Sequence, residues 1–247
     1  MHKVFWSALV VLLSACVSVD ERKGSPEQIA DVNVALAKQY YAKGLYDIAE
    51  EKLNKALSVE PDSVSANTLL ALIYDQQGLQ EKAGAQFRTT LDLVEDNSVE
   101  FAEVHNNYAI FLCKNGKWPE AEVSFKKAID VKAYQTKAEA MENAGLCALN
   151  AKDYENAGRY FETALKHNNT LLRAQLGLAK VKAQIGDWQA VRRIIEDFHR
   201  RAGTNEESLY LIAKASGMLN DTAAKKKYTD MLAQSFPKSE YLQKLEN

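Results

Sequence analysis

The stretch that decides the fold runs from Ala30 to Ser63 and reads ADVNVALAKQYYAKGLYDIAEEKLNKALSVEPDS. Apolar and small residues recur in it at helical spacing on both sides of Gly44, so it predicts two amphipathic helices joined by a tight turn. The same pattern returns five more times, with turn residues 34, 38, 36, 34 and 34 positions apart. These turn residues are Gly44, Gly78, Gly116, Lys152, Gly186 and Asn220. Most of the 247-residue chain therefore repeats one helix–turn–helix unit.

A two-helix unit of this size cannot bury its apolar face alone, so neighbouring units must stack. The order of residues within a unit, such as Tyr40, Gly44, Ala49 and Pro61 in the first copy, resembles the tetratricopeptide repeat. This resemblance implies an all-α fold, a right-handed superhelical solenoid of about six repeats over residues 29–240 with a C-terminal tail at 241–247. An unrelated helical bundle is the alternative, and six copies in phase argue against it.

The N-terminus has a different character. A basic start is followed by the apolar run 4–13, which is too short to span a bilayer, so residues 1–15 are interpreted as a secretory signal. Its end, Leu-Ser-Ala-Cys, resembles the bacterial lipobox, which makes Cys16 the predicted site of a covalent lipid. The alternative is an ordinary signal peptide with an unmodified cysteine. Residues 16–28 are predicted to be a lipidated tether, and Val17 in place of Asp indicates delivery to the periplasmic face of the outer membrane.

Composition and motifs exclude several classes of function. The chain carries 31 basic and 33 acidic residues, and apart from short runs the basic ones are scattered, so no stripe for nucleic acid is visible. No hydrolase, phosphate-binding, zinc-protease or dinucleotide motif occurs. The histidines of the mature chain, His105, His167 and His199, lie in three different repeats. We therefore expect no enzyme activity, metal site, cofactor or small-molecule substrate, and interpret the histidines as solvated or half-buried helix residues.

Two cysteines remain within the repeats. Cys113 and Cys147 lie 34 residues apart on the first helices of repeats three and four. Adjacent first helices pack side by side in a tetratricopeptide solenoid, which brings the two sulfurs within reach of each other. A disulfide is favoured in an oxidising compartment. Two separate buried thiols are the alternative, because free cysteine packs as a small hydrophobe.

The tetratricopeptide resemblance also implies a recognition surface, because the first helix of each repeat lines the concave face. Asparagine side chains can hydrogen-bond the backbone of a bound segment, and apolar neighbours can hold its side chains. The predicted groove residues are Leu69, Leu72, Asn106, Asn107, Ile110, Glu142, Asn143, Leu146 and Leu149. For Leu72, Ile110 and Leu146, a place in the core between helices is the alternative.

Two stretches are more specific than the generic repeat. One runs from His105 to Ala121 and the other from Glu142 to Phe161. Together with the lipobox and six repeats, they resemble the type IV pilus biogenesis lipoprotein family called PilF or PilW, over essentially the whole mature chain. Ala109 departs from that family, in which glycine is common at this position.

The PilF/PilW resemblance implies a pilotin, a lipoprotein that binds secretin subunits of the type IV pilus and promotes their localisation and multimerisation in the outer membrane. The expected partners are therefore a secretin subunit and, through the lipid anchor, the outer membrane. Two other binding roles stay open: a general envelope scaffold, and a pilus-stabilising factor that acts after secretin assembly. An enzyme with an unrecognised site is the remaining alternative.

Overall fold

The computed structural model describes residues 25–246, which form thirteen helices. The helices are α1 (Pro26–Ala42), α2 (Tyr46–Leu57), α3 (Val64–Gln76), α4 (Gln80–Leu93), α5 (Val99–Lys114), α6 (Trp118–Asp130), α7 (Lys137–Asn150), α8 (Tyr154–His167), α9 (Leu172–Gln184), α10 (Trp188–Ala202), α11 (Glu206–Met218), α12 (Thr222–Ser235) and α13 (Glu240–Glu246). The predicted all-α repeat solenoid is confirmed.

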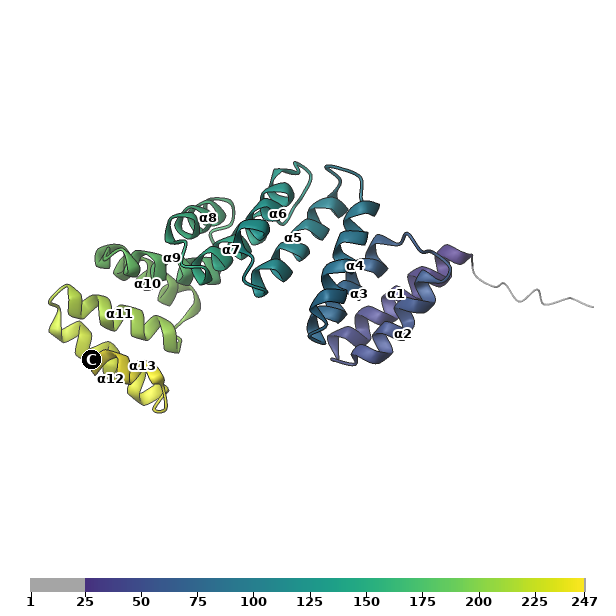
Figure 1. The fold of residues 1–247 in the computed structure, drawn as a ribbon. Coiled ribbons are helices and arrows are strands. Elements are labelled where there is room, and N and C mark those ends of the chain that lie inside the picture. The colour runs from purple at the N-terminus through teal and green to yellow at the C-terminus, as the bar shows by residue number, and fades with distance from the viewer. Residues whose placement is uncertain (1–24, 247) are drawn as a thin grey trace, which may run out of the picture.

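The helices pair in sequence order, α1 with α2 through α11 with α12, and the six pairs stack into an arch (Figure 1). The odd-numbered helices α3, α5, α7, α9 and α11 pack side by side as the inner row of the arch. The last helix, α13, lies where a C-terminal tail was expected and packs against α11 and α12. No helix among the described residues is both long and apolar enough to cross a membrane.

The six turns follow the spacing of the sequence repeat. Gly44, Gly78, Gly116 and Gly186 have φ between 72° and 78°, and the two turns without glycine use Lys152 at 62° and Asn220 at 59°. A left-handed residue at this point ends the first helix and reverses the chain. Each of the six turn positions read from the sequence is therefore confirmed.

Six of the helices, α1, α5, α8, α10, α11 and α12, start at a side chain that accepts a hydrogen bond from a free backbone N–H. Asp153, Asp187 and Asp221 each directly follow a turn residue and cap α8, α10 and α12 in the same way. At the other end of the chain, Ser25 caps α1 through a reciprocal box with Gln28, and Pro26 takes the first helical position. The first helix thus begins within the segment 16–28 that was predicted to be a tether.

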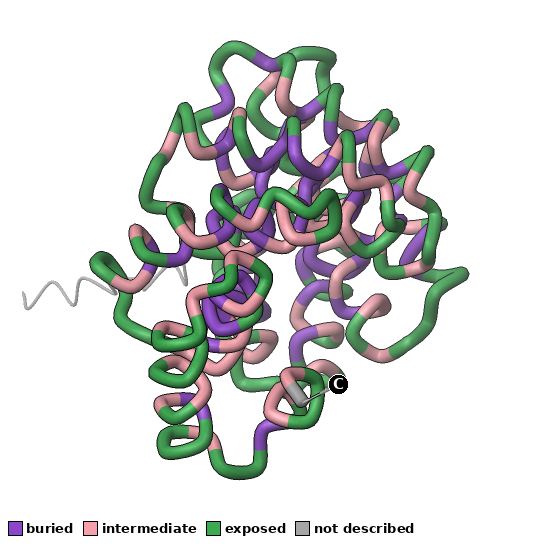
Figure 2. The backbone as a smooth tube through the Cα atoms, turned by 90° about the vertical axis from the view of Figure 1, so that its left-hand side faces the viewer, coloured by how far each residue is buried: buried purple, intermediate pink, exposed green. Residues whose placement is uncertain are grey.

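The core consists of four buried clusters, of which the central one reaches from α3 to α9. Buried residues lie inside the stacked helices, and the turns between helices are mostly exposed (Figure 2). Phe87, Phe125 and Phe161 occupy equivalent places in the second helices α4, α6 and α8, and all three are fully buried. Buried alanines surround them, since the helices cross closely there. Phe161 lies between α7 and α9, where Gly145 and Gly177 leave room for its ring.

A disulfide joins two neighbouring helices of the inner row. Cys113 on α5 and Cys147 on α7 are bonded, with 5.7 Å between their Cα atoms. The bond closes a loop of 34 residues that contains all of α6. It therefore fixes the third repeat to the fourth at the centre of the arch.

Candidate partner-binding surface

The inner row of helices carries the residues predicted to form a groove, and the structure divides them into three groups. The first group lies between α3 and α5, where Leu69, Leu72 and Asn107 line a hollow of about 190 Å³. Leu69 is only 6% exposed and belongs to the core of the first two repeats. Leu72 and Asn107 are half-buried, so they present side-chain surface to the hollow.

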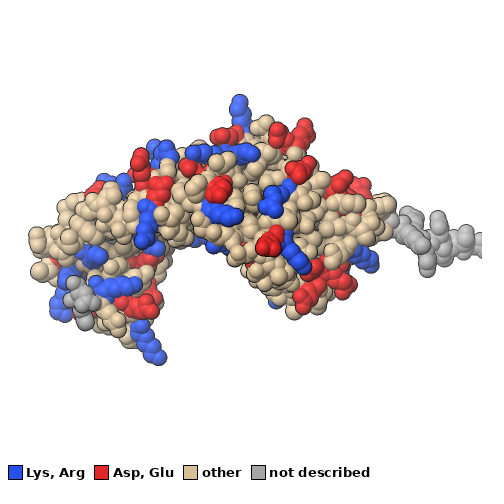
Figure 3. Space-filling view, viewed as in Figure 1, with Lys and Arg blue, Asp and Glu red and all other residues tan. Residues whose placement is uncertain are grey.

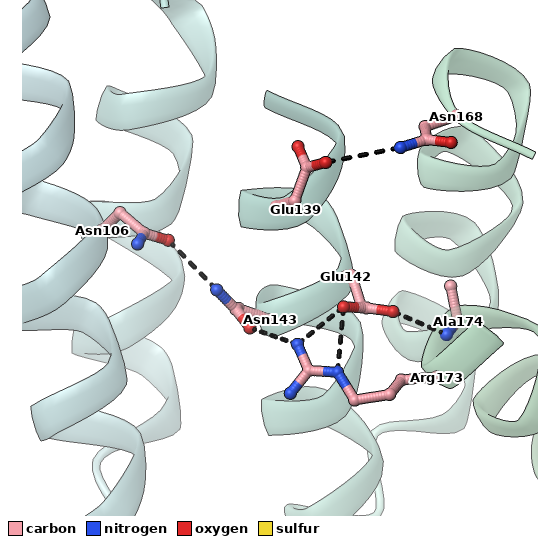
Figure 4. Close-up of polar contacts among 7 residues, drawn as sticks. All are labelled: Asn106, Glu139, Glu142, Asn143, Asn168, Arg173 and Ala174. Atoms are coloured by element: carbon pink, nitrogen blue, oxygen red, sulfur yellow. Dashed lines mark hydrogen bonds and ion pairs between the residues drawn. The ribbon is translucent and has the colours of Figure 1, made fainter. Parts of the chain in front are cut away.

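The second group is a row of polar side chains across α5, α7 and α9 (Figure 4). The Nδ2 of Asn143 donates a hydrogen bond to Oδ1 of Asn106 at 3.5 Å. The Oδ1 of Asn143 in turn accepts from the guanidinium of Arg173 at 3.1 Å. Both asparagines are half-buried, and the Arg173 side chain is 63% exposed. This chain of amides ending in a cation is suited to hydrogen-bonding the backbone of a bound segment.

Glu142 does not face a groove, and its prediction as a partner contact is wrong. It is 4% exposed, and one carboxylate oxygen accepts from Nε and Nη2 of Arg173 at 3.0 and 2.6 Å. The other oxygen accepts from the backbone N–H of Ala174 at 2.8 Å (Figure 4). Ala174 lies in the first turn of α9, where free N–H groups and the helix dipole favour a negative charge. Glu142 therefore fixes the start of α9 to α7.

Sequence reasoning missed Arg173. The predicted groove residues come from the second, third and fourth repeats only, and Arg173 lies at the start of the fifth. Its place on a first helix followed from the sequence repeat, but its ion pair with Glu142, 31 positions earlier, did not.

The third group consists of Ile110, Leu146 and Leu149. All three are half-buried and pack against the central core cluster. Each side chain therefore serves the core and also exposes part of its surface on the inner row. Leu149 additionally lines a larger hollow towards the C-terminal end of the arch.

The histidines have separate structural surroundings. His105 on α5 is 4% exposed rather than half-buried, with its ring against Phe101 at 4.3 Å between centroids. Burial, with a smaller contribution from the charge of Lys127, lowers the pKa of His105 to about 4. His199 pairs with the hydroxyl of Ser208 at 2.9 Å, and burial lowers its pKa as well. No group of three or more His, Cys, Asp or Glu residues suited to a metal ion occurs within residues 25–246.

The repeats match a known family of protein repeats. A tetratricopeptide-repeat profile matches residues 34–98 and 109–170, just over half of the chain, and a second such profile matches 207–239. The chain belongs to the tetratricopeptide-repeat family. The matched segments correspond to helices α1 to α8 and to the last pair, α11 and α12.

Among tetratricopeptide proteins, the chain is similar over nearly its whole length to the type IV pilus assembly protein PilF of Pseudomonas aeruginosa. The two are 27% identical over 237 residues, which span 94% of this chain and 92% of that relative. A solved structure of Pseudomonas aeruginosa PilF covers 90% of this chain at 25% identity and a TM-score of 0.79. The crystal structure of PilW, described as a widely conserved type IV pilus biogenesis factor, covers 89% at 26% identity and 0.78. The resemblance to the PilF/PilW family is confirmed.

The predicted lipid site lies outside the residues that the structure describes. Cys16, Val17 and the signal sequence 1–15 all precede residue 25. Lipidation and outer-membrane delivery therefore remain predictions from the sequence.

Proposed function

We propose that this protein is a pilotin of a type IV pilus system, an outer-membrane lipoprotein that binds secretin subunits and promotes their localisation and multimerisation. The observation that carries the proposal is the end-to-end similarity to PilF and PilW. The alignment with PilF spans more than nine-tenths of both chains. A match due to the repeat alone would not need to preserve the number of repeats, so this agreement supports a shared role in pilus assembly.

The inner row of helices supplies the chemistry that such a role needs. Asn106 and Asn143 offer amide groups for the backbone of a bound segment, while Leu72, Ile110 and Leu146 offer apolar surface beside them. Secretin subunits must cross an aqueous compartment with membrane-destined surface exposed. We propose that this groove covers part of that surface during transfer.

The anchor completes the proposal. A lipid on Cys16 would hold the solenoid at the membrane through about nine residues of tether, with an end-to-end distance of roughly 15–20 Å. Because a single acyl chain binds membranes only marginally, we expect stable anchoring to need more than one chain. The cargo and the anchor would then reach the same bilayer together.

The first test is an immunoblot of unboiled membrane samples for secretin multimers. The strains are wild type, a deletion of the gene and a Cys16→Ala substitution. We expect the multimer to be lost in the deletion strain and strongly reduced with Cys16→Ala. Undiminished multimers in the deletion strain would refute the pilotin proposal. Two functions would then stay open, a general envelope scaffold and a pilus-stabilising factor. Counts of surface fibres in a retraction-deficient strain would distinguish between them.

The groove is tested with paired substitutions. Asn106→Asp with Leu146→Glu places two negative charges on the inner row, and Val123→Glu is the matched control on α6, where the native side chain is 57% exposed. We expect the double variant to lose secretin capture and the control to retain it. A thermal melt accompanies both, because loss of the cooperative transition would show that the double variant had disrupted the core instead.

A further inference from the structure

Charge is distributed unevenly along the arch. Residues 25–97 contain 12 acidic and 6 basic side chains, whereas residues 172–246 contain 9 acidic and 13 basic ones. Figure 3 shows the acidic side chains prevailing at the N-terminal end of the molecule and the basic ones at the C-terminal end. The whole chain has a net charge of only −2, but its N-terminal end is negatively charged and its C-terminal end is positively charged.

The basic end contains a hollow that the sequence did not reveal. It measures about 520 Å³ and lies where the end of α7, the start of α8, and helices α9, α10 and α11 meet. Its walls combine three aromatic side chains with three lysines. The residues in question are Tyr154, Trp188, Tyr210, Lys152, Lys180 and Lys214.

One carboxylate lies among these lysines, and it already has partners. Glu207 forms an ion pair with Lys180 at 2.6 Å and accepts a hydrogen bond from the hydroxyl of Tyr241 at 3.2 Å. Within residues 25–246, neither Lys152 nor Lys214 forms a salt bridge. The hollow therefore carries an excess of positive charge.

The aromatic side chains hold one of these cations in place. The Nζ of Lys214 lies 5.9 Å from the ring centre of Trp188 and 5.7 Å from that of Tyr210. The same atom lies 3.3 Å from the hydroxyl oxygen of Tyr210. The lysine side chain is thus oriented by ring faces, which leaves its remaining donors for an incoming acceptor.

We propose that this hollow binds an extended protein segment that carries carboxylates next to an aromatic or aliphatic side chain. Lys152 and Lys214 pair with the carboxylates, and the faces of Trp188 and Tyr210 cover the apolar side chain. Charge complementarity favours this occupant. Two lysines of the hollow have no ion pair, and Glu207, the one carboxylate among its described lining residues, is already paired with Lys180. The inference is independent of the pilotin proposal, since it concerns a different part of the inner row from the asparagines of α5 and α7.

The test uses the detergent-solubilised full chain and a phage-displayed library of random peptides. We expect selection on the wild-type protein to enrich peptides in which Asp or Glu flanks an aromatic or aliphatic residue. A fluorescent peptide of the enriched sequence should bind about tenfold or more weakly to a Lys152→Glu, Lys214→Glu double variant, because two favourable charge contacts become repulsive. Lys132→Glu, an exposed lysine outside the hollow, is the matched control and should bind as wild type.

Two readouts locate the peptide. Binding should weaken as salt is added, since the pairs are partly exposed. It should also change the fluorescence of Trp188, and this change should be absent from a Trp188→Phe variant that keeps Trp118. The proposal is overturned if acidic peptides are not enriched, or if the double variant binds them as well as the control does. Charge-dependent binding of anionic phospholipid vesicles without any enriched peptide would also overturn it, in favour of a lipid surface.

Discussion

The ring of Phe161 offers a sharp test of how the centre of the arch is packed. A Cβ on Gly177 of α9 would lie 2.6 Å from Cε2 of Phe161 and still closer to Cζ. A Cβ on Gly145 of α7 would lie 2.7 Å from Cδ1 of the same ring. Because Phe161 is fully buried, the ring cannot move aside into solvent. We therefore expect Gly177→Ala to destabilise the protein.

The magnitude follows from two opposing effects. Replacing glycine by alanine inside a helix stabilises by about 1 kcal/mol. Forcing an extra methyl group into a well-packed core costs about 1–3 kcal/mol, and the contact distances at Gly177 lie well inside normal packing. Such close contacts place the cost in the upper part of that range, at about 2–3 kcal/mol, so the net loss should be about 1–2 kcal/mol.

Gly158→Ala is the matched control. Gly158 lies on α8, the same helix as Phe161, and its added Cβ would meet Cγ1 of Val181 at an ordinary 3.4 Å. This substitution should therefore stabilise the protein by up to about 1 kcal/mol through helix propensity. Urea unfolding followed by circular dichroism gives both free energies from the shift of the midpoint at constant slope.

A second substitution separates the clash from a backbone effect. In the Phe161→Leu background the ring is absent, so Gly177→Ala should lose most of its penalty, which a double-mutant cycle measures as a favourable coupling energy. Equal stability of Gly177→Ala and Gly158→Ala would refute the packing argument. So would a penalty that persists unchanged without the ring.

Three further outcomes are expected. Reduction of the Cys113–Cys147 bond should lower the free energy of unfolding by about 3–4 kcal/mol, measured by urea unfolding with and without reductant, and alkylation of two free thiols in the unreduced protein would disprove the bond. Glu142→Ala should cost about 2–3 kcal/mol in the same assay because it leaves the buried N–H of Ala174 without a partner; a neutral result would show that the contact is dispensable. His105 has a pKa of about 4 in the folded chain, below its ordinary value of 6.5. Its contribution to folding stability is therefore fully present above pH 6.5 and is lost as the pH falls towards 4, because the unfolded chain binds the proton first. Between pH 7 and 4.5 the wild type should lose about 2 kcal/mol more than His105→Leu, and parallel losses in the two proteins would contradict a buried neutral imidazole.

The repeated unit was predictable because its determinants are local. Gly44 and Lys152 show this, since their places in the sequence period alone identified the turns, and both adopt left-handed backbone angles. Glu142 shows the limit. Its register put it on the inner row, but its orientation is set by Arg173 and an N–H of α9, about thirty residues further along the chain. The period of the sequence repeat predicts the helix on which a residue lies. The direction of a polar side chain depends on partners that only the stacking of the repeats brings together.

The C-terminal hollow was missed for the same reason. Lys152, Lys180 and Lys214 are spread over three repeats and form no basic run in the sequence. Only the stacking of α7, α9 and α11 gathers them at one place. A search at the repeat period, rather than along the chain, would have paired Lys180 with Lys214, which lie 34 positions apart, but not Lys152, which lies 28 positions before Lys180.

The turn at Lys152 has a consequence for how this protein can change. Four of the six equivalent turns use glycine, while Lys152 adopts φ of 62°, a conformation that costs a side-chain-bearing residue about 1 kcal/mol. Lys152→Gly would relieve that strain and yet remove one of the cations proposed to capture an acidic segment. At this position the residue that favours a more stable fold is not the one that favours recognition. A screen for heat resistance should therefore select glycine at this codon, whereas a screen for peptide capture should retain lysine.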